Sequence, residues 1–426
     1  MMLSIMLIIL VVLILLGVPI AFSLGASSII YFLVERPTLI TMVPQRIWAG
    51  TNNFIIIAMP LFILAGELMN RGGLTKRIID FSLLVVRPIR GGLGEVNVVA
   101  SMIFGGISGS SVADTSALGS ILIPNMVKQG YGKGFSAGVT VASSTMGMII
   151  PPSVPMLIYA MISGASVGRL FLAGLVPGIL IGLSQLVVVY VLSKKHGYHP
   201  PVSKFVAREA IATIRNGMFA ILMPMIIILT VSLGIATASE SAAVAVLYAA
   251  ILGLFVYKEL SLRDIVIALK KTVMISSSIM VIVGFTMVYT WILAVEQIPV
   301  FIADFILGLQ VHPFVIFIFL DILILFIGTF VDVTPSLLLL VPILLPVMRQ
   351  FGIDELQFGA IMIVGTAIGL VTPPVGMCLN VATKICGLSI VQIFLHALPF
   401  IICNVIILIL VTFIPAVSTW LPSIIQ

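Results

Sequence analysis

The sequence has few charged residues, since Asp, Glu, Lys and Arg make up 8% of its 426 residues. Soluble domains carry about 25% of these residues, so this chain cannot cover itself with polar surface in water. Hydrophobic residues make up 61% of the chain. They recur in runs of about 20 residues, the length of a transmembrane helix. The runs do not alternate polar and apolar residues, which excludes a transmembrane β-barrel. The sequence therefore predicts an all-α polytopic membrane protein.

Cysteine and catalytic motifs are also scarce. The three cysteines, Cys378, Cys386 and Cys403, lie in apolar surroundings and are expected to be small core residues. The sequence contains no GxxxxGK[ST], HExxH or CxxC motif. We therefore expect no enzyme activity and an energy source other than ATP hydrolysis through that phosphate loop. The net charge of +6 does not indicate nucleic acid, because basic residues in membrane proteins usually report topology.

The apolar runs predict nine spans and two interrupted regions. The spans lie near 3–33, 54–70, 134–163, 169–193, 216–235, 237–257, 272–295, 356–386 and 390–420. The first lacks the basic flank of a signal peptide and is expected to be retained. Regions 93–127 and 313–349 are broken in the middle by Gly, Pro and polar residues, and each predicts a re-entrant helical hairpin. Segments 74–90 and 298–309 are expected to be amphipathic helices that lie at the membrane–water interface.

The basic residues support this layout. With the linker 194–215 in the cytoplasm, 17 of the 21 Lys and Arg residues fall on the inner side. The four on the outer side are Arg36, Arg46, Arg169 and Arg349. This asymmetry is the one that the positive-inside rule requires.

The two halves of the chain repeat each other with an offset of 222 residues. Structure-breaking residues coincide at this offset: Gly106 with Gly328, Pro124 with Pro346, Gly130 with Gly352, Gly147 with Gly369, and Pro151-Pro152 with Pro373-Pro374. The repeats are expected at 1–193 and 216–426, with scaffold helices within 1–90 and 216–295. Five spans separate the two hairpins, so the second copy is expected to be inverted. Inverted repeats with two broken transmembrane helices are typical of secondary transporters.

Four polar segments match in pairs across the repeat. FGGISGSSVADTS (104–116) matches IGTFVDVTPS (327–336), and SSTMGMIIPPSVP (143–155) matches GTAIGLVTPPVGM (365–377). Each Pro-Pro removes two N–H donors and frees carbonyls that need a partner in the bilayer. Carbonyls, hydroxyls and a carboxylate suit a hard cation such as Na⁺, and helix N-termini at the hairpin tips suit an anion. Alternatively, the small residues only allow close helix packing.

The acidic residues of the apolar regions differ in their expected roles. Asp332 lies at the tip of the second hairpin and Asp114 just past the tip of the first. Both are functional candidates, because a charge there needs a partner. Glu240 and Asp321 are each expected to be either a ligand or a structural hydrogen-bond partner. Glu67 lies at a cytoplasmic helix end, where we expect it to be solvated.

These segments resemble a known transporter family. GGISGSSVADTSALGSILIPNM, MGMIIPPSVPM, GTFVDVTPSLLLLVPILLP and GLVTPPVGMCLNVA are similar to the large membrane subunit of TRAP (tripartite ATP-independent periplasmic) transporters. The resemblance implies an elevator-type carrier of the ion-transporter superfamily in the bacterial inner membrane. It also implies coupling to Na⁺ and two partners, a small four-helix membrane subunit (Q) and a periplasmic substrate-binding protein (P). Since no segment precedes the first span, Q is expected to be a separate chain.

The resemblance also implies a substrate class and site residues. Substrates of the family are organic acids such as C4-dicarboxylates and sialic acid, and overall similarity favours sialic acid. By motif position, the Na⁺ ligands are expected among Ser108, Ser111, Asp114, Thr115, Ser144, Gly147, Pro151, Thr329, Asp332, Thr334, Thr366, Gly369, Thr372, Pro373 and Gly376. The substrate carboxylate is expected near Ser110, Ser153 and Asp332. As an anion itself, Asp332 is expected to bind Na⁺ or the hydroxyl or amide groups of the substrate.

Other functions stay open on the sequence alone. In an ion channel the same carbonyl-rich segments would form a filter, and single-channel currents would distinguish it. A stand-alone carrier would take up its substrate without partner subunits. A membrane-embedded enzyme would need a nucleophile–base pair or a metal set, and the sequence offers neither motif.

Overall fold

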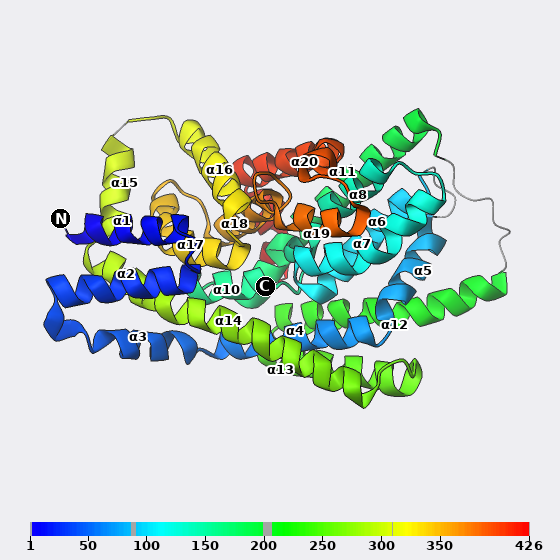
Figure 1. Ribbon diagram of the computed structural model, residues 1–426, viewed down its shortest axis with the longest axis horizontal. Helices are drawn as coiled ribbons and strands as arrows, with labels where there is room; N and C mark the ends of the chain where they lie inside the picture. Colours follow the sequence, from blue (N-terminus) through cyan, green and yellow to red (C-terminus); the bar gives the residue numbers. More distant parts are fainter. Residues whose placement is uncertain (1, 87–90, 199–206, 309, 426) are drawn as a thin grey trace.

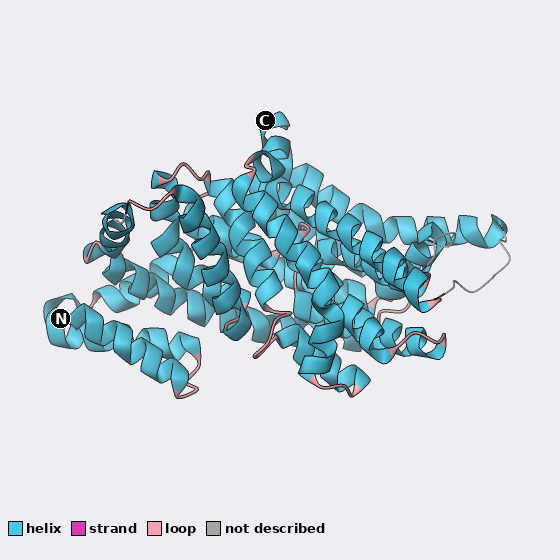
Figure 2. Cartoon of the chain, turned by 90° about the horizontal axis from the view of Figure 1, so that it is seen from above, coloured by secondary structure: helices cyan, strands magenta, loops and turns pink. Residues whose placement is uncertain are grey.

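The computed structural model describes residues 2–86, 91–198, 207–308 and 310–425. These residues form helices joined by short loops, and none of them lies in a strand (Figure 2). Eight of the helices are long and apolar enough to cross a membrane, or nine if the bent helix 133–163 counts as one span. The described part of the chain is therefore an all-helical polytopic membrane protein.

The first half of the chain carries eleven α-helices. They are α1 (Met2–Leu15), α2 (Ile20–Glu35), α3 (Met42–Thr51), α4 (Phe54–Arg71), α5 (Leu74–Val86), α6 (Leu93–Ser108), α7 (Ser111–Lys128), α8 (Lys133–Ser144), α9 (Met146–Ile149), α10 (Val154–Ser163) and α11 (Val167–His196). A short 3₁₀ turn, Pro37–Leu39, joins α2 to α3.

The second half follows the same order. It comprises α12 (Ala207–Ser232), α13 (Ala238–Ile251), a π-helical turn (Leu252–Val256), α14 (Leu262–Val295), α15 (Ile298–Gly308), α16 (Pro313–Phe330), α17 (Val333–Gln350), α18 (Glu355–Gly369), α19 (Met377–Cys386), α20 (Ile390–Phe413) and α21 (Ala416–Ile424).

The 222-residue offset also relates the helix boundaries. Adding 222 to the bounds of α7 gives 333–350, which are the bounds of α17. The same shift moves α6 to 315–330, against Pro313–Phe330 for α16, and moves α10 to 376–385, against Met377–Cys386 for α19. In Figure 1, α5 lies at the right and α15 at the left, and the hairpins α6–α7 and α16–α17 reach the middle from these opposite ends. We call these ends the α5 side and the α15 side.

Local sequence explains where the hairpins and broken helices are interrupted. Gly109 ends α6 in the left-handed region at φ +61°, and Ser110 then caps α7. In the second hairpin Asp332 caps α17 in an extended conformation. The pairs Pro151-Pro152 and Pro373-Pro374 interrupt the two broken helices, and both peptide bonds are cis. Each proline lacks the N–H that would continue the helix.

Long α14 connects the two sides of the molecule. Its 34 residues correspond to about 51 Å of helix. Near its N-terminus, Arg71 lies 3.6 Å from Asp264, and at its other end Arg36 lies 3.1 Å from Glu296. These ion pairs attach α4 on the α5 side and α2 on the α15 side to the same helix.

Two expected spans are divided in the structure. The segment 3–33 is not one helix, because Gly17, at φ +82°, and Pro19 separate α1 from α2, and the two helices pack against each other. The segment 390–420 ends as a helix at Phe413. Pro415 follows, and α21 packs against α11 instead of continuing α20. Proline and glycine inside apolar runs thus ended helices that hydropathy alone predicted to continue.

Two other boundaries differ from expectation. The helix expected at 272–295 begins ten residues earlier, because Ser261 and Asp264 form a capping box at its N-terminus. The ends of the expected linker 194–215 belong to α11 and α12. Residues 199–206 of that linker, 87–90 of the expected interfacial helix 74–90, and residue 309 lie outside the described residues.

Candidate functional site

A cavity of about 670 Å³ lies between the two hairpin tips and the long helices α4 and α14. Ser108, Gly109 and Ser110 line it from the first tip, and Asp332, Val333 and Thr334 from the second. Since Ser110 and Asp332 are 222 residues apart, the cavity brings together equivalent positions of the two repeats.

Both of these residues cap a helix at the cavity. The Ser110 hydroxyl accepts a hydrogen bond from the Ala113 N–H (3.4 Å), and a carboxylate oxygen of Asp332 accepts from the Val333 N–H (2.7 Å). The N-termini of α7 and α17 therefore meet at the cavity, where their dipoles present partial positive charge. Such ends suit an anionic ligand group.

Beside the cavity, the first tip and the first broken helix form a buried polar cluster around Asp114. The Ser108 hydroxyl donates to Oδ1 of Asp114, whereas Oδ2 is buried without a hydrogen-bond partner among the described residues. The carboxylate lies directly against Gly147, since a Cβ added there would collide with Oδ2. The Asp114 side chain is fully buried. A buried carboxylate oxygen without a partner is costly, and a cation is one way to satisfy it.

Hydroxyls extend this first cluster. The Thr115 hydroxyl is hydrogen-bonded to the Ser144 hydroxyl (2.7 Å) and donates to the Ser111 carbonyl (2.9 Å). The Ser111 hydroxyl is buried and, in the described part of the chain, has no hydrogen-bond partner. The Pro151 carbonyl, by contrast, faces Gly106 on α6. The first cluster, Ser108, Ser111, Asp114, Thr115, Ser144 and Gly147, thus contains two buried oxygen atoms that a cation could satisfy.

The equivalent second cluster is built differently. Gly328 of α16 and Gly369 of α18 lie so close that a Cβ on either would meet main-chain atoms of the other helix. Thr329 and Thr366 donate to main-chain carbonyls of their own helices at 2.8 and 2.6 Å, and Thr372, which follows α18, donates to the Ile368 carbonyl at 2.9 Å. These hydroxyls keep lone pairs for a cation. The remaining predicted members are Thr334, which lines the cavity, and Pro373 and Gly376, which interrupt the second broken helix.

The two clusters differ in charge. Asp114 lies inside the first cluster, whereas Asp332, the acidic residue of the second tip, is exposed to the cavity. Among the described residues, no group of three or more His, Cys, Asp or Glu side chains is placed to hold a metal ion. Hydroxyls, carbonyls and single carboxylates are hard oxygen ligands, the kind that alkali and alkaline-earth cations accept.

The structure gives Ser153 a different environment from Ser110 and Asp332. Its hydroxyl donates to the Met148 carbonyl at 2.5 Å, and it caps α10. The cavity wall contains Met148, Val154 and Pro155 at this point, and not Ser153. Ser153 therefore stabilises the interruption of the first broken helix.

The sequence-based expectation for Glu67 was wrong. Its side chain is 11% exposed, contacts the Lys271 ammonium and lies 3.9 Å from Nε of Arg71. It is paired because α14 runs alongside the end of α4, which the sequence of α4 alone does not show. Glu240 forms a capping box with Thr237, which gives it a structural role. Asp321 accepts a hydrogen bond from Thr412 at Oδ1 (2.9 Å), whereas its Oδ2 is buried without a hydrogen-bond partner among the described residues.

A set of buried amides that was not predicted from the sequence joins several helices. Asn97 donates to Thr140 (2.6 Å), Gln185 to Asn404 (2.8 Å) and Asn404 to Thr145 (3.2 Å). These bonds tie the first broken helix to α6, α11 and α20. A lone amide in an apolar helix was the available signal, because such a group needs an interhelical partner in the bilayer.

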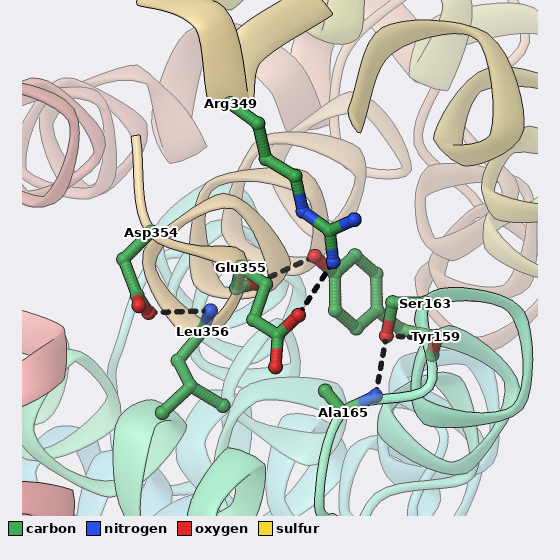
Figure 3. Close-up of polar contacts among 7 residues, drawn as sticks. All are labelled: Tyr159, Ser163, Ala165, Arg349, Asp354, Glu355 and Leu356. Atoms are coloured by element: carbon green, nitrogen blue, oxygen red, sulfur yellow. Dashed lines mark hydrogen bonds and ion pairs between the residues drawn. The ribbon is translucent and has the colours of Figure 1, made fainter. Parts of the chain in front are cut away.

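On the α15 side, α17 packs along α14 and leaves a smaller cavity of about 250 Å³. Figure 3 shows the polar contacts at its edge. The Tyr159 hydroxyl donates to the main-chain carbonyl of Glu355 (2.5 Å), and Arg349 donates to the Glu355 carboxylate (2.6 Å). Asp354 caps α18 by accepting from the Leu356 N–H (2.8 Å). These contacts hold the ends of α10, α17 and α18 together.

Comparison with known proteins is consistent with this architecture. Residues 7–417 match the family described as "Tripartite ATP-independent periplasmic transporter, DctM component". The chain is 38% identical to the sialic acid TRAP transporter large permease of Vibrio cholerae, over 96% of this chain and 95% of that protein. It is 36% identical to the C4-dicarboxylate TRAP transporter large permease of Pseudomonas aeruginosa, over 94% of each chain.

A solved structure shares the fold at low sequence identity. The YdaH transporter of Alcanivorax borkumensis superposes with a TM-score of 0.64 at 13% identity, covering 89% of each chain. The resemblance predicted from the polar segments is confirmed, and the expectation of a transporter that is not an enzyme is confirmed with it. The chain therefore belongs to the DctM family, the large permease component of tripartite ATP-independent periplasmic transporters, and is a multi-pass protein of the bacterial inner membrane.

Proposed function

We propose that this permease carries an organic acid anion into the cell together with Na⁺. The observation that carries the proposal is the cavity between the two hairpin tips, with a buried oxygen cluster directly behind the first tip. A permease that moves two solutes together needs two adjacent sites of different chemistry, and these two features supply them.

The organic anion is assigned to the cavity. Ser110 and Asp332 cap the helices whose positive ends meet there, and their free N–H groups suit a carboxylate. The relatives named above transport sialic acid or C4-dicarboxylates, both of which are carboxylates. Asp332 is itself an anion, so we assign it to Na⁺ or to hydroxyl or amide groups of the substrate.

The Na⁺ ion is assigned to the two clusters behind the tips. The first offers Oδ2 of Asp114 and the Ser111 hydroxyl, both buried without a partner among the described residues. The second offers the lone pairs of Thr329, Thr366 and Thr372. A cation bound between a tip and a broken helix would hold both in the geometry that the anion requires, which couples the two solutes.

We assign the α5 side to the cytoplasm, following the basic residues. The ends of α4, α7 and α11 on this side carry Arg71, Lys128, Lys194 and Lys195. The cavity wall contains Glu67, Asn70 and Lys271 toward this side, whereas α17 packs on α14 at the other. On this assignment we interpret the structure as an inward-facing state, in which the two repeats are inverted and the hairpins are re-entrant. We assign the hairpins and broken helices to a moving elevator domain.

The tripartite family implies two partners. We assign substrate delivery to a periplasmic binding protein (P) on the α15 side. A small membrane subunit (Q) would cover the apolar outer surface of the long helices, where Leu262, Val273 and Met274 of α14 are exposed. A permease that works alone is the alternative, and it predicts uptake without P or Q.

The test is uptake into liposomes that contain this permease with its Q and P proteins. Labelled sialic acid and labelled succinate are the probes, with and without an inward Na⁺ gradient. We expect uptake of one probe to require P and to stop when K⁺ replaces Na⁺ on both sides. Undiminished uptake without Na⁺ would refute the coupling, and single-channel currents in a planar bilayer would favour a channel instead.

A further inference from the structure

Two charged side chains in the cavity wall belong to the long helices and not to the hairpins. Glu67 of α4 and Lys271 of α14 both line the cavity, and the Glu67 carboxylate contacts the Lys271 ammonium. The Glu67 side chain is 11% exposed, whereas that of Lys271 is 50% exposed. The ammonium is therefore paired and still accessible to a molecule in the cavity.

The pair is one end of a row of four charges. Glu67 lies 3.9 Å from Arg71, and Arg71 lies 3.6 Å from Asp264. The row contains two cations and two anions, and Lys271 ends it at the cavity. Because Glu67 is shared between Lys271 and Arg71, it can leave the ammonium without becoming an unpaired buried charge.

The positions along α14 define a path. Lys271, Ile275 and Ile279 line the cavity at intervals of four residues, so they lie on one face of the helix. Lys271 lies nearest the N-terminus of α14 and hence toward the α5 side. An anion that moves from the hairpin tips toward the α5 side passes two apolar side chains and then meets the ammonium.

We propose that Lys271 binds the carboxylate of the substrate on its way out of the cavity, and that Glu67 is a built-in competitor that releases it. The inference rests on the proposed function, because it requires an anionic substrate. The substrate carboxylate and the Glu67 carboxylate compete for the same ammonium donors. When Glu67 takes the ammonium back, the anion loses its partner and leaves toward the α5 side.

Two charge-removing substitutions test this because their expected effects are opposite. Glu67→Gln removes the competitor and should tighten binding of the anion about fivefold, with slower turnover. Lys271→Gln removes the cation and leaves Glu67 facing the cavity, so binding should weaken about tenfold. Lys271→Arg keeps the charge and should stay within about twofold of wild type. Calorimetry on the purified permease, with succinate and sialic acid as probes in sodium buffer, measures these affinities.

Two matched variants control for the loss of charge alone. Lys270→Gln changes the neighbouring lysine of α14, which is exposed and does not line the cavity. Glu259→Gln removes a carboxylate that pairs with Arg77 (2.9 Å) away from the cavity. Neither variant should change the affinity for either probe.

The outcomes separate this inference from the proposed function. If Glu67→Gln and Lys271→Gln both weaken binding, the pair is structural and the competitor role is refuted. If both behave like the control variants while wild type takes up a probe in liposomes, the inference fails and the proposed function stands. If wild type neither binds nor takes up either probe, the proposed function fails and the inference fails with it.

Discussion

The interfaces of the two hairpins with the long helices are related by the repeat, yet they are arranged differently. On the α15 side, α17 packs along α14 and only about 250 Å³ remains between them. On the α5 side, the equivalent helices α7 and α4 both line the cavity of about 670 Å³. The two copies therefore present one nearly closed and one open version of the same interface. Under the proposed function, the two interfaces exchange these arrangements during transport, and the other state opens to the α15 side.

The largest expected effect comes from locking the closed interface. Thr286 of α14 and Leu338 of α17 both line the smaller cavity. With Thr286→Cys and Leu338→Cys introduced into a cysteine-free background, a short bifunctional maleimide should join the helices and abolish uptake in liposomes. The background replaces Cys378, Cys386 and Cys403.

A monofunctional maleimide on the same pair is the control and should leave most of the uptake intact. Full uptake by a cross-linked permease would show that this interface does not open during transport.

The next largest effect separates the two acidic residues of the tips. Asp114 is buried, and its Oδ2 has no hydrogen-bond partner in the described part of the chain, whereas Asp332 is exposed to the cavity. Asp114→Asn should therefore weaken the apparent Na⁺ affinity of uptake about a hundredfold, and Asp332→Asn about tenfold. Na⁺ titrations of uptake measure both values. Equal losses in the two variants would contradict the difference between the clusters.

Glycine substitutions distinguish the clusters by a different readout. A Cβ at Gly369 would meet the main chain of Gly328, which cannot move aside, so Gly369→Ala should destabilise the fold by about 1–3 kcal/mol. At Gly147 the added Cβ would meet the Asp114 carboxylate, so Gly147→Ala should mainly weaken the apparent Na⁺ affinity of uptake. Thermal unfolding in detergent measures the first effect and Na⁺ titration the second. Gly308→Ala is the control, since no described atom beyond its chain neighbours and its own helix backbone lies within 4 Å of the added Cβ.

The smallest expected effect concerns the ion pair at the edge of the closed interface. The Arg349 and Glu355 side chains are 51% and 34% exposed, and such pairs contribute about 0–1 kcal/mol. Arg349→Gln should raise the labelling rate of Thr290→Cys in the smaller cavity by at most about fivefold, measured with a membrane-impermeant maleimide. Arg169→Gln, an exposed arginine at the start of α11, should leave the rate unchanged. A slower rate in Arg349→Gln would mean that the ion pair favours opening.

Local sequence accounts for much of the fold and the position of the site. Matching Gly and Pro positions predict an offset of 222 residues between the repeats, and the boundaries of α7 and α17 differ by the same offset. The polar segments also pointed to Ser110 and Asp332, which line one cavity. These features are encoded locally, because a helix ends where Pro or Gly prevents its continuation and polar groups in the bilayer need partners.

Contacts between distant segments decide the features that local sequence did not predict. Whether Glu67 is solvated depends on Lys271, about 200 residues away and on another helix. The amide of Gln185 donates a hydrogen bond to Asn404 only because α11 and α20 pack together. Ser153 looked like Ser110 in sequence, but its hydroxyl turns to the Met148 carbonyl. Side-chain partners of this kind depend on which helices pack together, and the sequence of a single segment does not show that.

The sequence by itself determined that this protein is a helical membrane protein with a repeated pair of interrupted regions. Composition, run length and the spacing of Pro and Gly are sufficient for that, because the bilayer leaves few other ways to satisfy the backbone. Only the tertiary structure decided which interface is open and which oxygens lack partners. The acidic residues follow the repeat, since Asp332 is equivalent to Ser110, which also lines the cavity, and Asp114 is equivalent to Ser336, which is also buried. The widths of the two interfaces, by contrast, arise from how the helices pack, because the two copies have the same order of interrupted helices.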